Sequence, residues 1–244
     1  MTELAVSSTL GPKQNHLLAA LRSEAYARLM PDLELVPMKL GSSVYEAGVP
    51  MPYIYFPTTC MVSLLYVMAN GDSAEIAVIG NDGMVGVSVF MGDGIMSSRA
   101  VVQNAGKAYR LKSDRFMEEF ALGRSMHHLA LRFTQALIAQ MVQTGACNRH
   151  HTVPQQLCRW LLLTLDRLPG DTVTMTKQLI ANMLGVNREG VIEATDRLRE
   201  SGAISYSAGK INVLNRTKLE EASCECYEVV RKEIERLFAY EIPA

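Results

Sequence analysis

The sequence predicts an α+β protein in which an N-terminal double-stranded β-roll is followed by a long helix and a C-terminal winged helix-turn-helix. Three observations favour this class. Residues 33–111 hold short apolar runs separated by glycines, residues 125–148 repeat apolar side chains at helical spacing, and residues 176–213 have the pattern of two helices and a hairpin. This order of strand-like and helix-like segments indicates a strand-rich domain that is joined to a helical one.

Composition and length agree with two ordinary domains. The chain has 244 residues, 48% of them hydrophobic and 20% charged, which is enough for two apolar cores. No apolar run approaches the roughly 18 residues that cross a bilayer, and residues 1–15 lack the basic start and apolar core of a signal peptide. We therefore expect a cytoplasmic protein without membrane contact. Its cysteines are odd in number and lack Cys-x-x-Cys spacing, which fits reduced thiols.

The N-terminal part is expected to begin with an amphipathic helix over residues 15–30, which Pro31 ends. The turn Ala69-Asn-Gly-Asp72 separates the first two of several β-like runs. These runs are residues 62–68, 74–79, 99–103 and 107–111. Many short strands with glycine turns indicate a small barrel or roll. With its N-terminal helix, we expect this domain to span residues 1–124.

Two helical segments follow the roll. Ser113 is expected to cap a helix through Phe120. The long helix then carries one apolar stripe, spaced by three and four: Met126, Leu129, Phe133, Leu137 and Met141. Such a stripe is typical of a helix that pairs with its copy, so we expect residues 125–150 to form a dimerisation helix and hinge. Ordinary packing against the roll is the alternative.

The C-terminal domain is expected over residues 151–244 and holds the most specific pattern. After a helix over residues 154–168, a second helix would end at Gly185, because glycine tolerates the positive φ of a tight turn. Asn187 would cap the next helix. Alternating apolar residues around Ala208-Gly209 then predict a wing. The whole is a winged helix-turn-helix, with a purely structural module as the alternative.

The polar side chains of this module favour DNA as its ligand. Arg188 and Glu189 follow the Asn187 cap directly, where a reading helix meets base edges. An arginine can bind guanine with two hydrogen bonds, and a glutamate can accept one from cytosine. Phosphates would be bound by the start of the preceding helix and by the wing, through Thr176, Lys177, Gln178 and Lys210. A module whose helix-turn-helix docks a protein is the alternative, and Arg188 argues against it.

The chain resembles the Crp/Fnr family of bacterial transcription regulators over nearly its whole length. The resemblance is most specific at residues 176–194, where Arg188-Glu189 match the family's base-reading pair. It implies a homodimer that binds pseudo-palindromic double-stranded DNA, a roll of the cyclic-nucleotide-binding type that senses an effector, and RNA polymerase as a further partner. A second arginine often stands four residues after the glutamate. Here that position holds Glu193, so we expect a different half-site.

The roll departs from the members that bind cyclic AMP. Those carry a Gly-Glu pair for the ribose and an Arg-Ser pair for the phosphate, and here the positions hold Gly86-Val87 and Ser98-Arg99. Val87 cannot accept from ribose hydroxyls, and the displaced Arg99 would point to the opposite face of its strand. The phosphate would lose its charge-assisted partner. We expect a degenerate pocket that does not bind cyclic AMP, and either another signal or constitutive DNA binding.

Other cofactors are not expected either. An oxygen-sensing iron–sulfur cluster would need a cysteine group near the N-terminus, and no cysteine precedes Cys60. His16 or Cys60 could bind haem, but lone residues of this kind are commonly packing or surface groups. No hydrolase, phosphate-loop or zinc-hydrolase signature occurs, so we expect no enzyme.

Two candidate metal ligands lie at the end of the long helix. Cys147 and His151 stand four residues apart and could share a helix face and a metal ion. A polar linker is the alternative, and we expect no metal here. Cys224 and Cys226 point to different faces of a helix, which favours a structural role.

Overall fold

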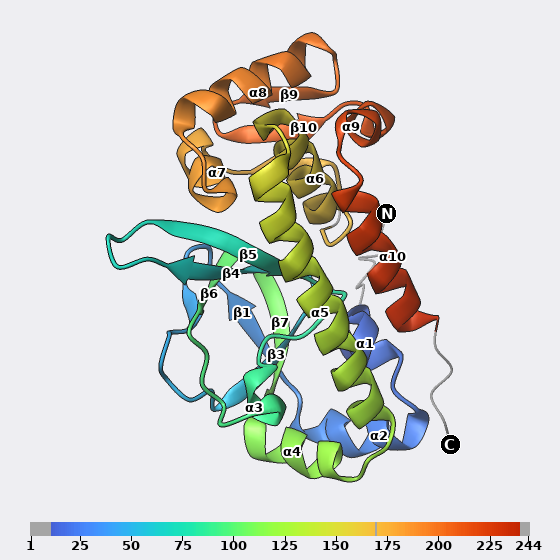
Figure 1. The fold of residues 1–244 in the computed structure, drawn as a ribbon. Helices are drawn as coiled ribbons and strands as arrows, with labels where there is room; N and C mark the ends of the chain where they lie inside the picture. Colours follow the sequence, from blue (N-terminus) through green and yellow to red (C-terminus); the bar gives the residue numbers. More distant parts are fainter. Residues whose placement is uncertain (1–10, 169, 240–244) are drawn as a thin grey trace, which may run out of the picture.

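A computed structural model describes residues 11–168 and 170–239 of the chain. Figure 1 shows a strand-rich part and a helical C-terminal part, with the long helix α5 (Ser125–His150) running between them. The predicted fold class is confirmed. The outer ends of the predicted domains, residues 1–10 and 240–244, lie outside the described residues.

The roll consists of two antiparallel sheets, with strand orders β1-β7-β3 and β2-β6-β4-β5. Their bounds are β1 (Glu34–Met38), β2 (Ser43–Tyr45), β3 (Tyr53–Pro57), β4 (Met61–Val67), β5 (Ser73–Ile79), β6 (Arg99–Asn104) and β7 (Gly106–Lys112). The four predicted strands are confirmed as β4 to β7. Strands β1 and β3 both contain a proline and β2 has three residues, so their sequences give weak signals.

The N-terminal helix is divided. The chain forms α1 (His16–Ala19) and α2 (Ser23–Leu29) between the 3₁₀ turns Pro12–Gln14 and Met30–Asp32, so the prediction of one continuous helix was wrong. Asn15 caps α1 and is buried, and its side chain donates to the carbonyls of Pro57 and Gly83. These bonds fix α1 on the roll, whereas α2 packs against α4 (Ser113–Ala121).

Two short helices complete this part. Helix α3 (Ser88–Met91) follows Val87, and α4 follows β7. Ser113 was predicted to cap α4, and this prediction was wrong. The serine is the first residue of the helix, and its hydroxyl donates to the carbonyl of Met51 instead of accepting from the helix. The serine thereby fastens α4 to the roll.

The apolar stripe of α5 is buried against the roll of the same chain. Met126, Leu129, Phe133 and Leu137 are buried in the core of the roll, and Met141 is half-buried against the same core. The Phe133 ring packs directly on the backbone of Gly83 in the roll. A Cβ atom at that glycine would lie only 2.4 Å from the ring. The prediction that this stripe forms a dimer face was therefore wrong, because the roll of the same chain already covers it.

The C-terminal part contains five helices and a three-stranded sheet of order β8-β10-β9, counted over the described residues. The helices are α6 (Val153–Leu165), α7 (Lys177–Leu184), α8 (Arg188–Glu200), α9 (Arg216–Ala222) and α10 (Cys226–Phe238). The strands are β8 (Thr172–Thr174), β9 (Ile204–Ser207) and β10 (Lys210–Val213). Helix α10 lies beside α5 (Figure 1).

Two buried polar contacts join α6 and the residues after it to the roll. The guanidinium of Arg167 lies 2.8 Å from the carboxylate of Asp82, and both side chains are almost fully buried. The indole Nε1 of Trp160 donates to Glu75 in β5. The roll and the helical part therefore share a buried interface as well as the connection through α5.

Candidate nucleic-acid interface

The helix-turn-helix is built from local signals that the sequence predicted. Thr176 caps α7 and accepts from the backbone N–H of Leu179 at 3.2 Å. Gly185 ends that helix with φ +65°, in the left-handed region that a glycine adopts without a Cβ clash. Asn187 caps α8 and accepts from the backbone N–H of Gly190 at 2.8 Å. The turn between α7 and α8 is therefore held at both ends by its own residues.

The apolar positions of the module form one core. Ile180 and Leu184 of α7 are buried together with Val191 and Leu198 of α8. This packing fixes α8 against α6 and α7 and directs its polar side chains outward. The wing is confirmed as β9 and β10, joined by Ala208 and Gly209, which both have positive φ.

Arg188 and Glu189 lie in the first turn of α8 and are both exposed. Arg188 has no ion-pair partner within the described part of the chain, so its guanidinium is available to a ligand. Glu193, one turn further along, is exposed and paired with Arg197. Figure 1 shows α8 at the end of the molecule opposite α4, where a duplex can approach it.

The four residues predicted to contact phosphate lie at the start of α7 and in the wing, and they differ in their surroundings. Lys210 is exposed at the start of β10, next to the turn of the wing. Gln178 is exposed and donates to Asn182 at 3.0 Å. The ammonium of Lys177 instead lies 4.0 Å from Asp196 and 5.2 Å above the ring of Tyr206, so this lysine is directed toward the module itself. Thr176 uses its hydroxyl as the helix cap.

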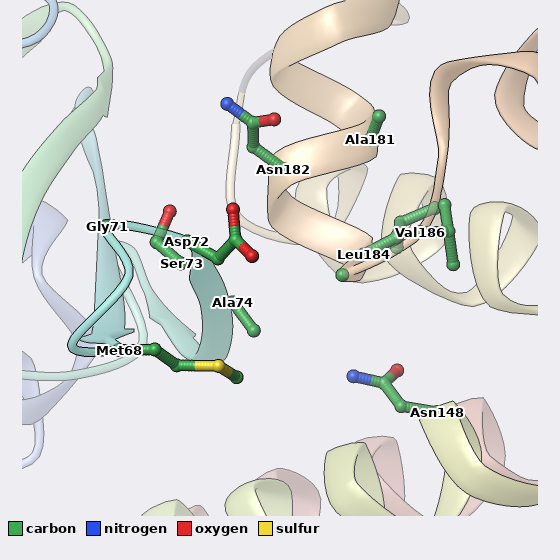
Figure 2. A pocket seen from close by; sticks show the side chains of 11 residues that line it. Met68, Gly71, Asp72, Ser73, Ala74, Asn148, Ala181, Asn182, Leu184 and Val186 are labelled. Carbon is green, nitrogen blue, oxygen red and sulfur yellow. The ribbon is translucent and has the colours of Figure 1, made fainter.

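A pocket of about 440 Å³ lies between the roll and the helix-turn-helix. Figure 2 shows Met68 and Asp72 of the β4–β5 hairpin on one side, Asn182 of α7 on another, and Asn148 pointing in from the end of α5. The hairpin also reaches the turn before α8, since a Cβ on Gly185 would lie 3.6 Å from that of Ala74. The sequence did not predict this contact between the two parts.

The residues at the predicted effector pocket contact other groups of the chain. The guanidinium of Arg99 lies 3.2 Å from the carboxylate of Glu46 at the surface, whereas its neighbour Ser98 is buried and lies 3.2 Å from the hydroxyl of Tyr45. Ser98, just before β6, is thus buried, whereas Arg99, its first residue, is directed outward. Val87 follows Gly86 at the start of α3 and packs its side chain against the core.

Comparison with known proteins agrees with this arrangement. Residues 155–222 match the family model of the Crp-like helix-turn-helix domain. A transcriptional regulator of the Crp/Fnr family from Eubacterium rectale shares 13% identity, with 86% of this chain and 98% of that chain covered and a TM-score of 0.66. FixK2 from Bradyrhizobium japonicum shares 16% identity over 79% and 98% of the two chains, also with a TM-score of 0.66.

A third structure with this fold is the c-di-GMP responsive global regulator CLP from Xanthomonas campestris. It shares 14% identity, covers 79% of this chain and 99% of that chain, and has a TM-score of 0.60. No curated protein sequence matches the chain. The expected resemblance to the Crp/Fnr family is confirmed: the chain has the fold of Crp/Fnr-family structures, and its C-terminal part matches the Crp-like helix-turn-helix domain. The matched proteins from Eubacterium rectale and Xanthomonas campestris are both described as regulators.

The helices that the structure describes include none with the length and apolar character needed to cross a membrane.

Proposed function

We propose that this protein is a cytoplasmic, sequence-specific transcription regulator that binds a pseudo-palindromic promoter site as a homodimer. The exposed pair Arg188-Glu189 at the start of α8, within a Crp-like helix-turn-helix domain, carries the proposal. A side chain at the start of a reading helix can reach base edges in the major groove. RNA polymerase is the expected further partner at a promoter.

The face of α5 that is turned away from the roll supports a homodimer. Its exposed apolar residues are Leu131 (42% exposed), Ile138 (52%) and Val142 (66%). Gln135 lies between Leu131 and Ile138 and is also exposed. Along the sequence these four exposed residues are therefore spaced by four, three and four positions, as on one side of a coiled coil. A second copy of α5 would remove these side chains from water. We therefore assign the dimer contact to this face, in place of the stripe that the roll covers.

Pairing along α5 would present two copies of α8 to the same duplex. Such readers contact half-sites about 34 Å apart, which is one turn of DNA. The β4–β5 hairpin that lines the pocket against α7 gives the roll a direct contact with the reading module. A signal bound by the roll would change DNA affinity by favouring one arrangement of this contact. We infer a signal other than cyclic AMP, because Arg99 pairs with Glu46 and the apolar side chain of Val87 packs against the core. Constitutive binding is the alternative.

A selection on random duplex DNA at fixed salt tests the proposal. The full chain is compared with Arg188→Ala and with Arg199→Ala, which removes an equal charge at the far end of α8. We expect a two-fold motif with half-sites about one turn apart, weakened by Arg188→Ala and retained by Arg199→Ala. Enrichment of no sequence, with and without added cell extract, would contradict the proposal and favour a module that docks a protein.

A further inference from the structure

Four metal-binding side chains meet where the long helix ends. Cys147 lies in the last turn of α5, and His151 follows its final residue. Cys224 lies between α9 and α10, and Cys226 is the first residue of α10. One donor atom from each lies within 4.8 Å of the donor atoms of the others. The three cysteines are buried, and His151 is half-buried at the surface.

Two of the distances between donor atoms match the edges of a tetrahedral zinc site. The sulfurs of Cys147 and Cys224 are 3.6 Å apart, and the sulfur of Cys226 lies 3.4 Å from Nδ1 of His151. Zinc bonds of about 2.3 Å to sulfur and about 2.0 Å to nitrogen imply edges of about 3.8 Å and about 3.5 Å in a regular tetrahedron. A disulfide would require a sulfur–sulfur distance of about 2.0 Å, so the two cysteines are separate thiols, each able to bind a metal.

We propose that Cys147, His151, Cys224 and Cys226 bind a zinc ion through three thiolates and Nδ1 of the histidine. Thiolate and imidazole donors favour Zn²⁺ over hard cations such as Mg²⁺ or Ca²⁺. Four protein ligands complete the coordination, which is the pattern of a structural site and leaves no position for a substrate. The ion would join the end of α5 to the start of α10, two segments that are about 75 residues apart in sequence.

The surrounding side chains orient the ligands. Nε2 of His151 lies 3.4 Å from the carboxylate of Glu225, which leaves Nδ1 to face the cysteines. A carboxylate at the second ring nitrogen is the usual arrangement around a histidine that binds zinc. Gln143 donates from its side-chain nitrogen to the sulfur of Cys226 at 3.0 Å, a contact that stabilises a thiolate.

A buried cation compensates the charge of the site. Three thiolates and one Zn²⁺ ion have a net charge of about −1, which is costly to bury alone. The guanidinium of Arg159 is 3% exposed and interacts electrostatically with Cys147. It donates to Thr144 at 3.1 Å, while its Nε has no hydrogen-bond partner and the described residues offer it no ion pair within 4.0 Å. This guanidinium also interacts electrostatically with Glu75, and an anionic zinc site gives the buried charge a further partner.

The first test is the metal content of the full chain. Protein expressed with added zinc and purified with reductant but without chelator is measured by inductively coupled plasma mass spectrometry. We expect about one zinc ion per chain in the unaltered protein and less than about a tenth of that in Cys224→Ser and Cys226→Ser. Cys60→Ala and Cys158→Ala change buried cysteines outside the cluster and are expected to keep the zinc. Cobalt substitution should give tetrahedral d–d bands and thiolate charge-transfer bands.

Further measurements separate loss of the ion from loss of the fold. Circular dichroism shows whether each variant remains folded, and hydrogen exchange with and without chelator follows α10. We expect the amides of Cys226–Phe238 to exchange faster after zinc removal, while those of β4 and β5 stay unchanged. The proposal is overturned if the folded protein holds no zinc when all thiols are free. It is also overturned if mass spectrometry finds a Cys147–Cys224 disulfide in protein prepared with reductant.

Discussion

The indole Nε1 of Trp160 donates a hydrogen bond of 3.1 Å to Oε1 of Glu75 and so connects α6 to strand β5 of the roll. The other oxygen of Glu75 accepts from the hydroxyl of Ser63 at 2.6 Å. The carboxyl is only 6% exposed, and burial raises the pKa of Glu75 to about 7, although the two hydrogen bonds act in the opposite direction. The interface between the roll and the helical part therefore contains a group that titrates near neutral pH.

Stability should depend on this carboxyl between mildly acidic and mildly basic pH. Its pKa is higher in the folded chain than the ordinary 4.5, so the folded state binds more protons in this range. The free energy of unfolding should consequently fall as the pH rises from about 5 to about 8, by up to about 3 kcal/mol. Urea unfolding at both pH values should show this fall in the unaltered protein and a smaller one in Glu75→Gln. The exposed Glu200→Gln is the control, and equal slopes in all three would exclude this role of Glu75.

The ion pair between Arg167 and Asp82 should show the cost of an unpaired buried charge. Asp82→Ala leaves the guanidinium of Arg167, 3% exposed, without its carboxylate and should lower the free energy of unfolding by about 3–5 kcal/mol. The double change Asp82→Leu with Arg167→Met should cost less than the single one, because it buries no charge. Chemical denaturation measures both. A double variant less stable than Asp82→Ala would mean that packing at this position outweighs the charge.

The two faces of α5 should respond differently to substitution. Ile138→Asp places a charge on the exposed face and should dissociate the proposed dimer, as measured by sedimentation or light scattering. Phe133→Ala removes a ring from the core and should cost about 3–5 kcal/mol of stability while the folded fraction stays dimeric. Val229→Asp, on the exposed side of α10, is the matched control for added charge. A chain that is dimeric despite Ile138→Asp would place the interface elsewhere.

DNA affinity should depend on Arg188 in a sequence-specific manner. Arg188→Ala should lose about 1–3 kcal/mol on the selected site and relax the preference at one base of each half-site. Fluorescence anisotropy with the selected duplex and single-base variants measures this. Arg199→Ala, whose guanidinium is paired with Asp196, should change affinity less. An equal loss on every duplex would assign Arg188 to the phosphate backbone.

Cyclic AMP should not bind to the roll with useful affinity. The phosphate would have no guanidinium partner, because Arg99 pairs with Glu46 on the outer face of its strand. The ribose would meet the apolar side chain of Val87. Isothermal titration calorimetry of the full chain should give no binding heat at micromolar concentrations of the nucleotide. Binding at micromolar affinity or tighter would disprove this prediction and reassign the signal.

Much of the reading module could be predicted from the sequence because its signals are local. Gly185 ends one helix through a backbone conformation that depends on the residue itself. Asn187 begins the next by accepting a hydrogen bond from a residue three positions later. The positions of Arg188 and Glu189 follow directly from that cap, so no distant contact was needed to place them.

For the long helix, local signals in the sequence were not sufficient. Its periodicity located a stripe through Leu129 and Phe133, but a stripe defines only a face to be buried and not the surface that buries it. The roll of the same chain covers that face, and Ile138 and Val142 remain exposed on another.

The sequence by itself determined the order of the elements and the side chains of the helix-turn-helix, because caps, turns and periodicity act within a few residues. Only the tertiary structure decided which face of α5 is covered and which distant residues meet. Cys147 and Cys224 are 77 positions apart, and no pattern in either segment indicates the other. Their sulfurs come within 3.6 Å because α10 packs along α5, a contact between whole helices that depends on the complete fold.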